Sequence, residues 1–370
     1  MAESRLTLRA LNRAYLARQM LLARDEITPL GAVERLVALQ AQLARPPFVA
    51  LWARVAGFER EQLLDLVRRR EVVRATMLRG TLHLASARDY LRFRAALQPA
   101  LDVGMGVVKK RLGGVDLERV LRAGQTLFAE RARTFEDVRG RLAEHGLEGD
   151  ERAMAYAVRL RLPLVQAPAE GTPWGWDAKE VVFADAGSWL GAAPDGDARP
   201  HALVRRYLAA FGPATPADAG AWCGLKGLRA VFDEMRPELV AVRDEAGREL
   251  FDLPDAPRPG EDAEAPVRFL PDFDVLVLSH DDRRRVVADE HRPRIMSANL
   301  IGAPTFLVDG FVAGTWKAER KRGAAVLSVE PFATLGKRVR SALEQEGDAL
   351  LRFVEPGAKG YEVRFAIRDA

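Results

Sequence analysis

One order of secondary-structure signals occurs three times along this chain: several short helices, then two β-prone runs joined by a tight turn. In the first copy, residues 6–22 carry apolar side chains at helical spacing, and Thr28-Pro29 supplies an N-cap followed by proline at the first helical position. Two β-prone runs, residues 73–78 and 81–84, then form a hairpin signal. Three helices followed by a hairpin is the order of a winged helix, a variant of the helix-turn-helix.

The other two copies extend this pattern over most of the chain. The second copy combines helices, one of them capped by Thr134, with strands around a loop rich in glycine and proline. The third copy ends in a hairpin that turns at residues 245–247, and the proline-rich acidic stretch "DLPDAPRPGEDAEAP" after it reads as a solvated linker. We therefore expect an α+β fold of three tandem winged-helix domains and a C-terminal β-rich domain. The expected domains cover residues 1–111, 112–196, 197–260 and 266–370.

Composition excludes several classes of protein. No apolar run approaches the roughly 20 residues needed to cross a bilayer. The N-terminus contains arginines throughout and lacks the apolar core of a secretory signal. The single cysteine, Cys223, excludes a disulfide framework and a cysteine-based zinc site. We expect a cytoplasmic protein, associated with the nucleoid and without membrane contact.

Positive charge is concentrated at the N-terminal end. Residues 1–111 contain 20 Lys and Arg against 10 Asp and Glu, a net charge of +10, whereas the whole chain carries only +4. Eighteen of these 20 cations are arginine, the residue that pairs best with phosphate. The asymmetry indicates a polyanionic partner at the basic end. An arginine-rich composition on solvated helices would produce the same excess, and composition does not separate these two interpretations.

Two glutamines, Gln40 and Gln42, lie at the end of the second expected helix, "LGAVERLVALQ". On a regular helix, side chains two residues apart point in directions about 200° apart and cannot serve one site. The backbone must therefore leave the helix if both act, and Pro46-Pro47 make such an unwinding plausible. Amides do not titrate near neutral pH, but they can hold a water or place a dipole beside developing charge. Without further information, two such glutamines are more often polar surface.

The first hairpin carries Arg79, Thr81 and His83. Because side chains alternate along a strand, Thr81 and His83 share one face. These residues suit a wing pressed against DNA phosphates. An ordinary hairpin with a solvated arginine and a half-buried histidine explains the same sequence equally well.

A second charged stretch, "LSHDDRRRVVADEH", contains two histidines and the run Arg283, Arg284 and Arg285. The histidines lie eleven residues apart without the helical spacing of a zinc motif, so we expect no metal site. The three arginines suit phosphate or acidic loops, although a solvated loop is the simpler interpretation.

Asp272 and Asp274 in "LPDFDVLVL" lie two residues apart at an expected strand start, which would place both on one face. Paired carboxylates can perform acid–base work, but such pairs more often cap turns, and we prefer that interpretation. The chain contains no phosphate-binding loop or dinucleotide fingerprint, so we expect no cofactor.

Taken together, four stretches resemble one family, the winged-helix DNA glycosylases of the AlkZ/YcaQ type. They are "LVALQAQLARPPFVALWARV", "VRATMLRGTLHLASARDY", "FLPDFDVLVLSHDDRRRVV" and "TFLVDGFVAGTWK". The resemblance covers nearly the whole chain and implies three winged helices and a β-rich domain around a basic DNA channel. It also implies a catalytic Gln-Φ-Gln motif, which falls on Gln40-Ala41-Gln42, with alanine as a small version of the apolar middle residue. We expect DNA contacts at Arg45, Arg79, Thr81, His83, Arg283, Arg284, Arg285 and Lys317.

The Gln/Gln branch of this family implies removal of bulky N7-alkylguanine adducts and unhooking of interstrand crosslinks. Alkylation at N7 makes the purine cationic and a good leaving group, so no acid is needed, and two oriented carboxamides beside a water suffice. We expect a monomeric, monofunctional DNA glycosylase that acts on duplex DNA carrying alkylated purines, in base-excision repair or in self-resistance to a toxin. The alternative is a non-catalytic winged-helix regulator of transcription.

Overall fold

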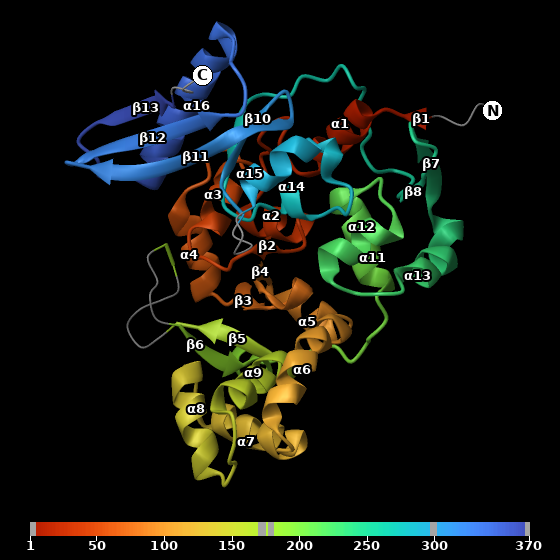
Figure 1. Ribbon diagram of the computed structural model, residues 1–370, viewed down its shortest axis with the longest axis vertical. Coiled ribbons are helices and arrows are strands. Elements are labelled where there is room, and N and C mark those ends of the chain that lie inside the picture. Colours follow the sequence, from red (N-terminus) through yellow and green to blue (C-terminus); the bar gives the residue numbers. More distant parts are fainter. Residues whose placement is uncertain (1–4, 169–174, 177–180, 297–301, 367–370) are drawn as a thin grey trace.

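The computed structural model describes residues 5–168, 175–176, 181–296 and 302–366 (Figure 1). It is a mixed α+β structure with three separate β-sheets, so the expected fold class is confirmed at that level. In the described parts of the chain, no helix combines the length and the apolar character needed to span a membrane.

The first unit follows the expected order of helices and hairpin. Its elements are α1 (Leu8–Arg18), α2 (Pro29–Arg35), α3 (Pro46–Trp52), α4 (Arg60–Arg68), β3 (Val72–Thr76), β4 (Leu82–Ser86) and α5 (Ala87–Phe93), with a 3₁₀ turn, η1 (Leu78–Gly80), between β3 and β4. Thr28 caps α2 as expected, because its hydroxyl accepts the N–H of Gly31 at 3.1 Å. The predicted hairpin is also confirmed, since β3 and β4 pair in antiparallel register from Val72–Ser86 to Thr76–Leu82.

The helix after Thr28 is shorter than the sequence pattern indicates. It ends at Arg35, and Val37 takes a left-handed backbone conformation with φ +67°. The chain then forms β2 (Leu39–Gln40), which pairs with β4 so that Gln40 lies opposite His83. The expectation of a helix through Gln40 is therefore wrong. Burial of residues 36–41 against the sheet outweighs the local helical spacing.

The second unit shares its sheet with the first. It contains α6 (Gln98–Leu112), α7 (Leu117–Glu130), α8 (Phe135–Glu144), α9 (Glu151–Arg161), β5 (Leu164–Ala167) and β6 (Val182–Asp185). Thr134 caps α8, as its sequence position indicates. However, β5 pairs with β3 through Ala75 and Val165, and the strand order is β2-β4-β3-β5-β6. The two hairpins and β2 thus form one continuous five-stranded sheet, an arrangement that the sequence did not reveal.

The third unit is the most regular copy. It contains α11 (His201–Phe211), α12 (Pro216–Cys223), α13 (Leu228–Met235), the 3₁₀ turn η2 (Arg236–Glu238), β7 (Val240–Asp244) and β8 (Glu249–Asp252). The short helix that precedes it, α10 (Ala186–Leu190), packs on β5 and β6 of the second unit. Strands β7 and β8 form the expected hairpin, which turns at Gly247 with φ +78°. The N-terminal β1 (Arg5–Leu6) adds to β7 in parallel, so the start of the chain lies beside this unit (Figure 1).

The C-terminal part is β-rich, as expected, with one long helix against its sheet. It contains β9 (Arg268–Leu270), α14 (Val275–Leu278), η3 (Arg283–Arg285), η4 (Asp289–His291), α15 (Arg292–Ile295), β10 (Thr305–Val308), β11 (Phe311–Lys321), β12 (Ala324–Pro331), α16 (Lys337–Val354) and β13 (Tyr361–Phe365). The strand order is β13-β12-β11-β10-β9. One expectation is wrong here, because the chain after Pro271 does not continue as a strand but turns into α14.

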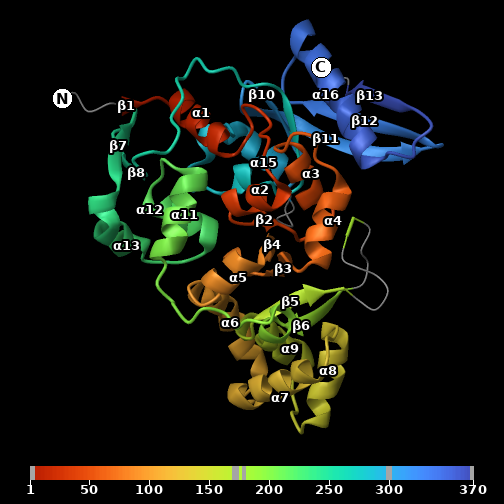
Figure 2. The same cartoon turned by 180° about the vertical axis from the view of Figure 1, so that it is seen from behind.

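Buried arginine–aspartate pairs join units that are distant in the sequence. Arg18 of α1 forms a bidentate pair with Asp252 of β8, at 2.7 and 2.8 Å. Arg54 forms a second pair with Asp274 at the start of α14, at 2.9 and 2.6 Å. All four side chains are excluded from solvent. Removal of one partner would leave an unpaired buried charge, so these pairs hold the first unit, the third unit and the C-terminal part in one arrangement. Figures 1 and 2 show the second unit projecting away from this body.

Candidate active site

The edge of the shared sheet carries the two glutamines. Gln40 ends β2 and is only 9% exposed, whereas Gln42 lies two residues further along and is exposed. Ala41 between them is fully buried, and its N–H donates to Leu82 O of β4 at 2.8 Å. The helix ends before Gln40, and Gln42 lies in a bend just after β2, so helical spacing does not force the two side chains apart.

Hydrogen bonds fix the orientation of both amides. Gln40 Oε1 accepts a hydrogen bond from Arg79 Nη2 at 2.9 Å, and Gln42 Oε1 accepts one from the backbone N–H of Leu82 at 3.3 Å. Both partners are donors, so the oxygen of each amide must face the partner and the Nε2 group must face the other way. Within the described residues, neither Nε2 has an acceptor, and neither is sealed from solvent. The site therefore offers two oriented N–H₂ donors.

Arg79 links Gln40 to the third unit. Its φ is +54°, a left-handed conformation in the turn between β3 and β4. Its guanidinium donates to Gln40 Oε1 and also to the carbonyl of Trp222 at the end of α12. A Cβ at Gly224 would lie 3.2 Å from Arg79 Cα, so the small residue there allows this close approach. Burial lowers the pKa of Arg79 to about 10, which leaves the group cationic at neutral pH.

Arg74 of β3 holds the backbone of the same segment from beneath. Its Nε donates to Ala41 O at 2.6 Å, its Nη2 to Gln42 O at 3.0 Å, and its Nη1 to Gln166 Oε1 of β5 at 2.6 Å. Burial, with a smaller contribution from Arg159, lowers the pKa of Arg74 to about 10. The guanidinium thus connects the backbone carbonyls of Ala41 and Gln42 to Gln166 on β5 of the second unit.

His83 is a buried structural residue, which corrects the expectation that it contacts DNA. Its side chain is inaccessible to solvent, and its Nδ1 lies 3.0 Å from Thr81 O, so the proton is on Nδ1. Burial, assisted by the nearby Arg79, lowers the pKa of His83 to about 3. The ring is neutral at physiological pH and faces the protein interior, where no phosphate can reach it. Thr81 lies beside it, with its hydroxyl donating to Leu78 O at 3.2 Å.

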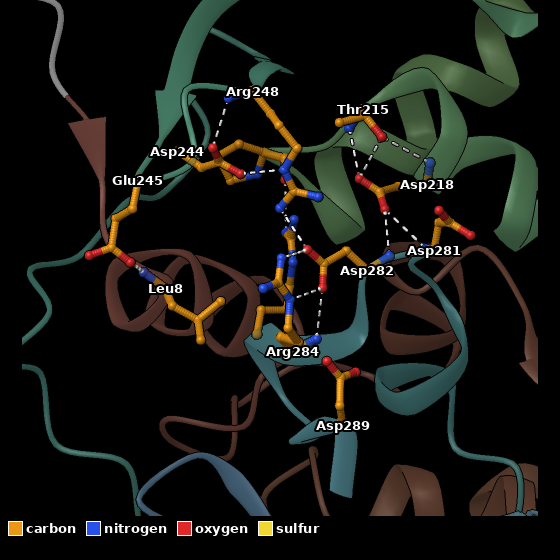
Figure 3. Close-up of polar contacts among 12 residues, drawn as sticks. Leu8, Thr215, Asp218, Asp244, Glu245, Arg248, Asp281, Asp282, Arg284 and Asp289 are labelled. Atoms are coloured by element: carbon orange, nitrogen blue, oxygen red, sulfur yellow. Dashed lines mark hydrogen bonds and ion pairs between the residues drawn. The ribbon is translucent and has the colours of Figure 1, made fainter.

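The arginine run does not behave as three equivalent cations. Arg284 is exposed, but Asp282 binds its Nε at 2.9 Å and its Nη2 at 2.6 Å, and Asp282 also binds Arg248 (Figure 3). Arg285 is only 3% exposed and donates to Pro213 O at 2.8 Å. The expectation of a DNA contact at Arg285 is therefore wrong, because its guanidinium lies in the interior.

Arg283 differs from its two neighbours. It is half-buried, and its Nε is buried without a hydrogen-bond partner. Burial, with a contribution from Arg292, lowers its pKa. The positive charge of Arg283 also contributes to the lowered pKa of Arg79, so the two guanidinium groups repel each other. Arg79 is the arginine that binds Gln40. Of the three arginines, Arg283 is therefore the one with a free N–H group that can bind an anion.

The remaining predicted DNA contacts lie on the surface near the C-terminal sheet. Arg45, just before α3, is exposed, and its guanidinium lies 5.0 Å from the ring centroid of Trp176. Lys317 of β11 is 71% exposed and forms an ion pair with Glu319. Both cations are accessible to a ligand.

The two aspartates of "LPDFD" have different environments. Asp274 caps α14 through the N–H of Leu276 and pairs with Arg54, so the capping interpretation is confirmed for this residue. Asp272 is half-buried and forms no ion pair among the described residues, and only its own backbone N–H acts on the carboxylate as a hydrogen-bond donor. Burial raises the pKa of Asp272.

Sequence reasoning missed Arg74, Gln166 and the distinct character of Asp272. A signal for Arg74 existed, because it is a charged residue inside the otherwise apolar run "VVRAT", where a buried strand would need a partner for it. His280, by contrast, is buried and its Nε2 lies 3.0 Å from Phe211 O, which is a structural role. In the described part of the chain, no three His, Cys, Asp or Glu side chains converge in a way that could hold a metal ion.

Helix–hairpin units around a pair of oriented, neutral amides are suited to DNA chemistry that needs no titrating acid, as in a DNA glycosylase. A family model described as "DNA glycosylase AlkZ-like" matches residues 33–353, so the chain belongs to this family and is an enzyme of the DNA glycosylase class. This finding sets aside the alternative of a non-catalytic regulator.

Two comparisons with individual proteins agree with the family. The chain is 27% identical over 359 residues to an interstrand DNA cross-link repair glycosylase of Streptomyces sahachiroi, covering 90% of this chain and 93% of the relative. The structure resembles that of the Streptomyces sahachiroi DNA glycosylase AlkZ with a TM-score of 0.75 and 22% identity, over 98% of this chain and 100% of the other. At that identity the structural likeness shows the fold.

Proposed function

We propose that this DNA glycosylase hydrolyses the N-glycosidic bond of N7-alkylated purines, with Gln40 and Gln42 as its catalytic residues. The supporting observation is the pair of Nε2 donors at the edge of the shared sheet, each oriented by a hydrogen bond to its own Oε1. The backbone between them is held by Arg74, so the donors are preorganised.

The chemistry of the substrate explains why neutral groups suffice. An N7-alkylated purine carries a positive charge, and when the C1′–N9 bond breaks, its electron pair stays on N9 and neutralises the base. A water oxygen then bonds to C1′, and one proton of that water passes to solvent. Gln40 Oε1 retains a second lone pair for a water proton, while the two Nε2 groups can donate to the water or to sugar oxygens. No step requires a titrating side chain.

Duplex DNA is the proposed partner, bound by the chain as a monomer in the cytoplasm. The three helix–hairpin units suit winged-helix contacts to the duplex, and Arg45, Arg283 and Lys317 offer cations for phosphates. The relative from Streptomyces sahachiroi is named for interstrand DNA cross-link repair. By analogy, we include crosslinks and other bulky N7-guanine adducts among the proposed substrates, in repair or in self-resistance to a toxin.

The test uses two duplexes, one with a single N7-methylguanine and one with a bulky aromatic N7-guanine adduct. After incubation, hot alkali cleaves the strand at each abasic site. We expect cleavage with the wild-type chain and none above background with Gln40→Ala or Gln42→Ala, whose affinities for DNA remain close to that of the wild type. Gln345→Ala, which changes an exposed glutamine on α16, is the matched control. Intact strands from both duplexes with the wild-type chain would overturn the proposal.

A further inference from the structure

A pocket lies between α3 and the C-terminal sheet, next to the glutamine segment. Figures 1 and 2 both place α3 beside β11. The pocket has a volume of about 480 Å³, within the usual range of small-molecule sites. Its apolar walls include Val49 of α3, Trp316 of β11, Val354 of α16 and the ring of Trp176.

The pocket adjoins Gln40. A smaller cavity is lined by Gln40 and also by Pro46, Pro271 and Asp272, and these last three residues line the large pocket as well. Asp272 therefore stands where the two spaces meet. The cavity at Gln40 has a volume of about 10 Å³, room for roughly one water, so a group in the large pocket would lie next to that water position.

The charged side chains that line the pocket differ in whether they have an ion-pair or hydrogen-bond partner. Lys317 is paired with Glu319, and the guanidinium of Arg45 lies over Trp176. Among the carboxylates of the wall, Glu330 accepts a hydrogen bond from Thr315 and Glu355 lies 4.0 Å from Arg320. Asp272 is largely covered by burial and has no ion-pair partner in the described parts of the chain. A buried carboxylate is destabilised unless it is paired, so this position favours a cationic occupant.

The backbone next to Asp272 is held in an unusual conformation. Phe273 has φ +57°, which is uncommon for a residue with a side chain. The next residue, Asp274, is fixed by Arg54 at 2.6 and 2.9 Å. These contacts separate the two aspartates, so that Asp274 is neutralised by Arg54 while only Asp272 reaches the large pocket. Such preorganisation is typical of a binding position.

We propose that this pocket binds the cationic alkylated purine together with its aromatic substituent, and that Asp272 is the charge partner of the cation. The inference rests on the proposed function, because a planar group that carries a positive charge beside Gln40 is what an N7-alkylpurine would present. Stacking on aromatic and aliphatic walls would hold the plane, and the carboxylate would favour the charged, damaged base over a neutral normal purine.

The reaction itself would end this attraction. The base is cationic before the C1′–N9 bond breaks and neutral afterwards, so the carboxylate attracts the substrate and not the released product. Attraction to the base is already present in the ground state, and its loss therefore raises KM without lowering kcat. A carboxylate that stabilised the sugar cation would instead affect kcat.

The experiment measures selectivity without turnover. In a Gln42→Ala background, the affinities for a bulky N7-adduct duplex and for the undamaged duplex are compared with and without Asp272→Asn. We expect Asp272→Asn to reduce the ratio of these affinities about tenfold and to leave binding of undamaged DNA unchanged. Asp348→Asn, an exposed carboxylate on α16 that is paired with Arg352, is the matched control.

Trp176→Ala is a second variant, which we expect to weaken binding of the bulky adduct and to have a smaller effect on N7-methylguanine. Unchanged selectivity in folded Asp272→Asn, or a fall in kcat at constant KM in the otherwise native chain, overturns the inference. If the wild-type chain binds the adduct selectively through Asp272 but releases no base, the pocket is supported and the proposed function fails. The two conclusions are therefore tested separately.

Discussion

The glutamine segment, residues 39–42, and the arginine run, residues 283–285, differ in a way that their sequences conceal. The first contains no charge, yet two arginines and a strand pairing hold it in one orientation. The second carries three positive charges, yet Asp282 neutralises Arg284 (Figure 3) and the interior encloses Arg285. Residue type alone therefore predicts function poorly, and the partners of each side chain decide what it can still bind.

The largest expected effect tests the glutamine segment directly. Removal of one oriented hydrogen-bond donor from an active site typically lowers the rate by roughly 10²–10³-fold. We expect Gln40→Ala and Gln42→Ala each to lower single-turnover excision of an N7-alkylguanine by about 10²-fold or more. A double variant that is no slower than the single variants would show that the two amides act as one unit. Activity within threefold of the wild type in both single variants would remove these residues from the mechanism.

The next effect tests the support beneath the glutamines. Arg74→Lys keeps the charge but loses the planar fork that reaches Ala41 O, Gln42 O and Gln166 Oε1. We expect kcat to fall about tenfold with KM nearly unchanged, because the donors are displaced while DNA contacts remain. Gln166→Ala should lower kcat less, since it removes one of the three contacts.

Arg94→Lys is the matched control for Arg74→Lys. Arg94 is also a buried arginine that donates to backbone carbonyls, at Leu160, Arg161 and Leu162, but it lies away from the glutamines. Both variants should lower the melting temperature, and only Arg74→Lys should lower kcat. Equal losses of kcat would attribute the effect of Arg74 to stability alone.

A smaller effect distinguishes the members of the arginine run. Loss of one phosphate contact reduces the slope of log affinity against log salt by roughly 0.9. We expect this reduction in Arg283→Ala, whose Nε has no partner, and little change in Arg284→Ala, whose charge Asp282 already compensates. Binding of an undamaged duplex between 50 and 200 mM salt, followed by fluorescence anisotropy, measures both slopes. A larger change in slope for Arg284→Ala than for Arg283→Ala would show that Arg284 leaves Asp282 and binds a DNA phosphate.

The smallest effect concerns pH, because a buried neutral histidine lies beside each region, His83 opposite Gln40 and His280 three residues before Arg283. Burial lowers the pKa of His83 and of His280 to about 3, far below the ordinary value of 6.5. The unfolded chain therefore binds more protons than the folded chain between these values. The free energy of unfolding is therefore unaffected by these histidines above pH 6.5. It decreases as the pH falls towards 3, by up to about 1.4 kcal/mol per pH unit for each histidine.

Denaturant unfolding of His83→Asn at several pH values measures this effect. The amide can replace the donor on Nδ1 but does not titrate, so we expect a shallower loss of stability in acid than in the wild type. The rate of excision at saturating substrate should be independent of pH between about 5 and 9, since the glutamines do not titrate and the pKa values of Arg74 and Arg79 are about 10. A bell-shaped rate profile in that range would indicate an acid or base that the proposed mechanism lacks.

The sequence by itself determined the features that depend on local contacts. Thr28 and Thr134 cap their helices as their positions indicate, because a cap is formed within four residues. The sequence also predicted the hairpins β3–β4 and β7–β8, since turn residues and alternating side chains specify them locally. The resemblance to a family also directed attention to Gln40 and Gln42, which no periodicity would have selected.

Only the tertiary structure decided how distant segments meet. The end of α2 at Arg35 follows from the pairing of β2 with β4, and the common sheet of the first two units follows from the contact of β3 with β5. Likewise, Asp274 is neutralised and Asp272 is not because Arg54, more than 200 residues earlier in the chain, reaches only one of them. Local propensities differ by less than the free energy of burying an apolar segment or pairing a buried charge, so non-local contacts determine these features.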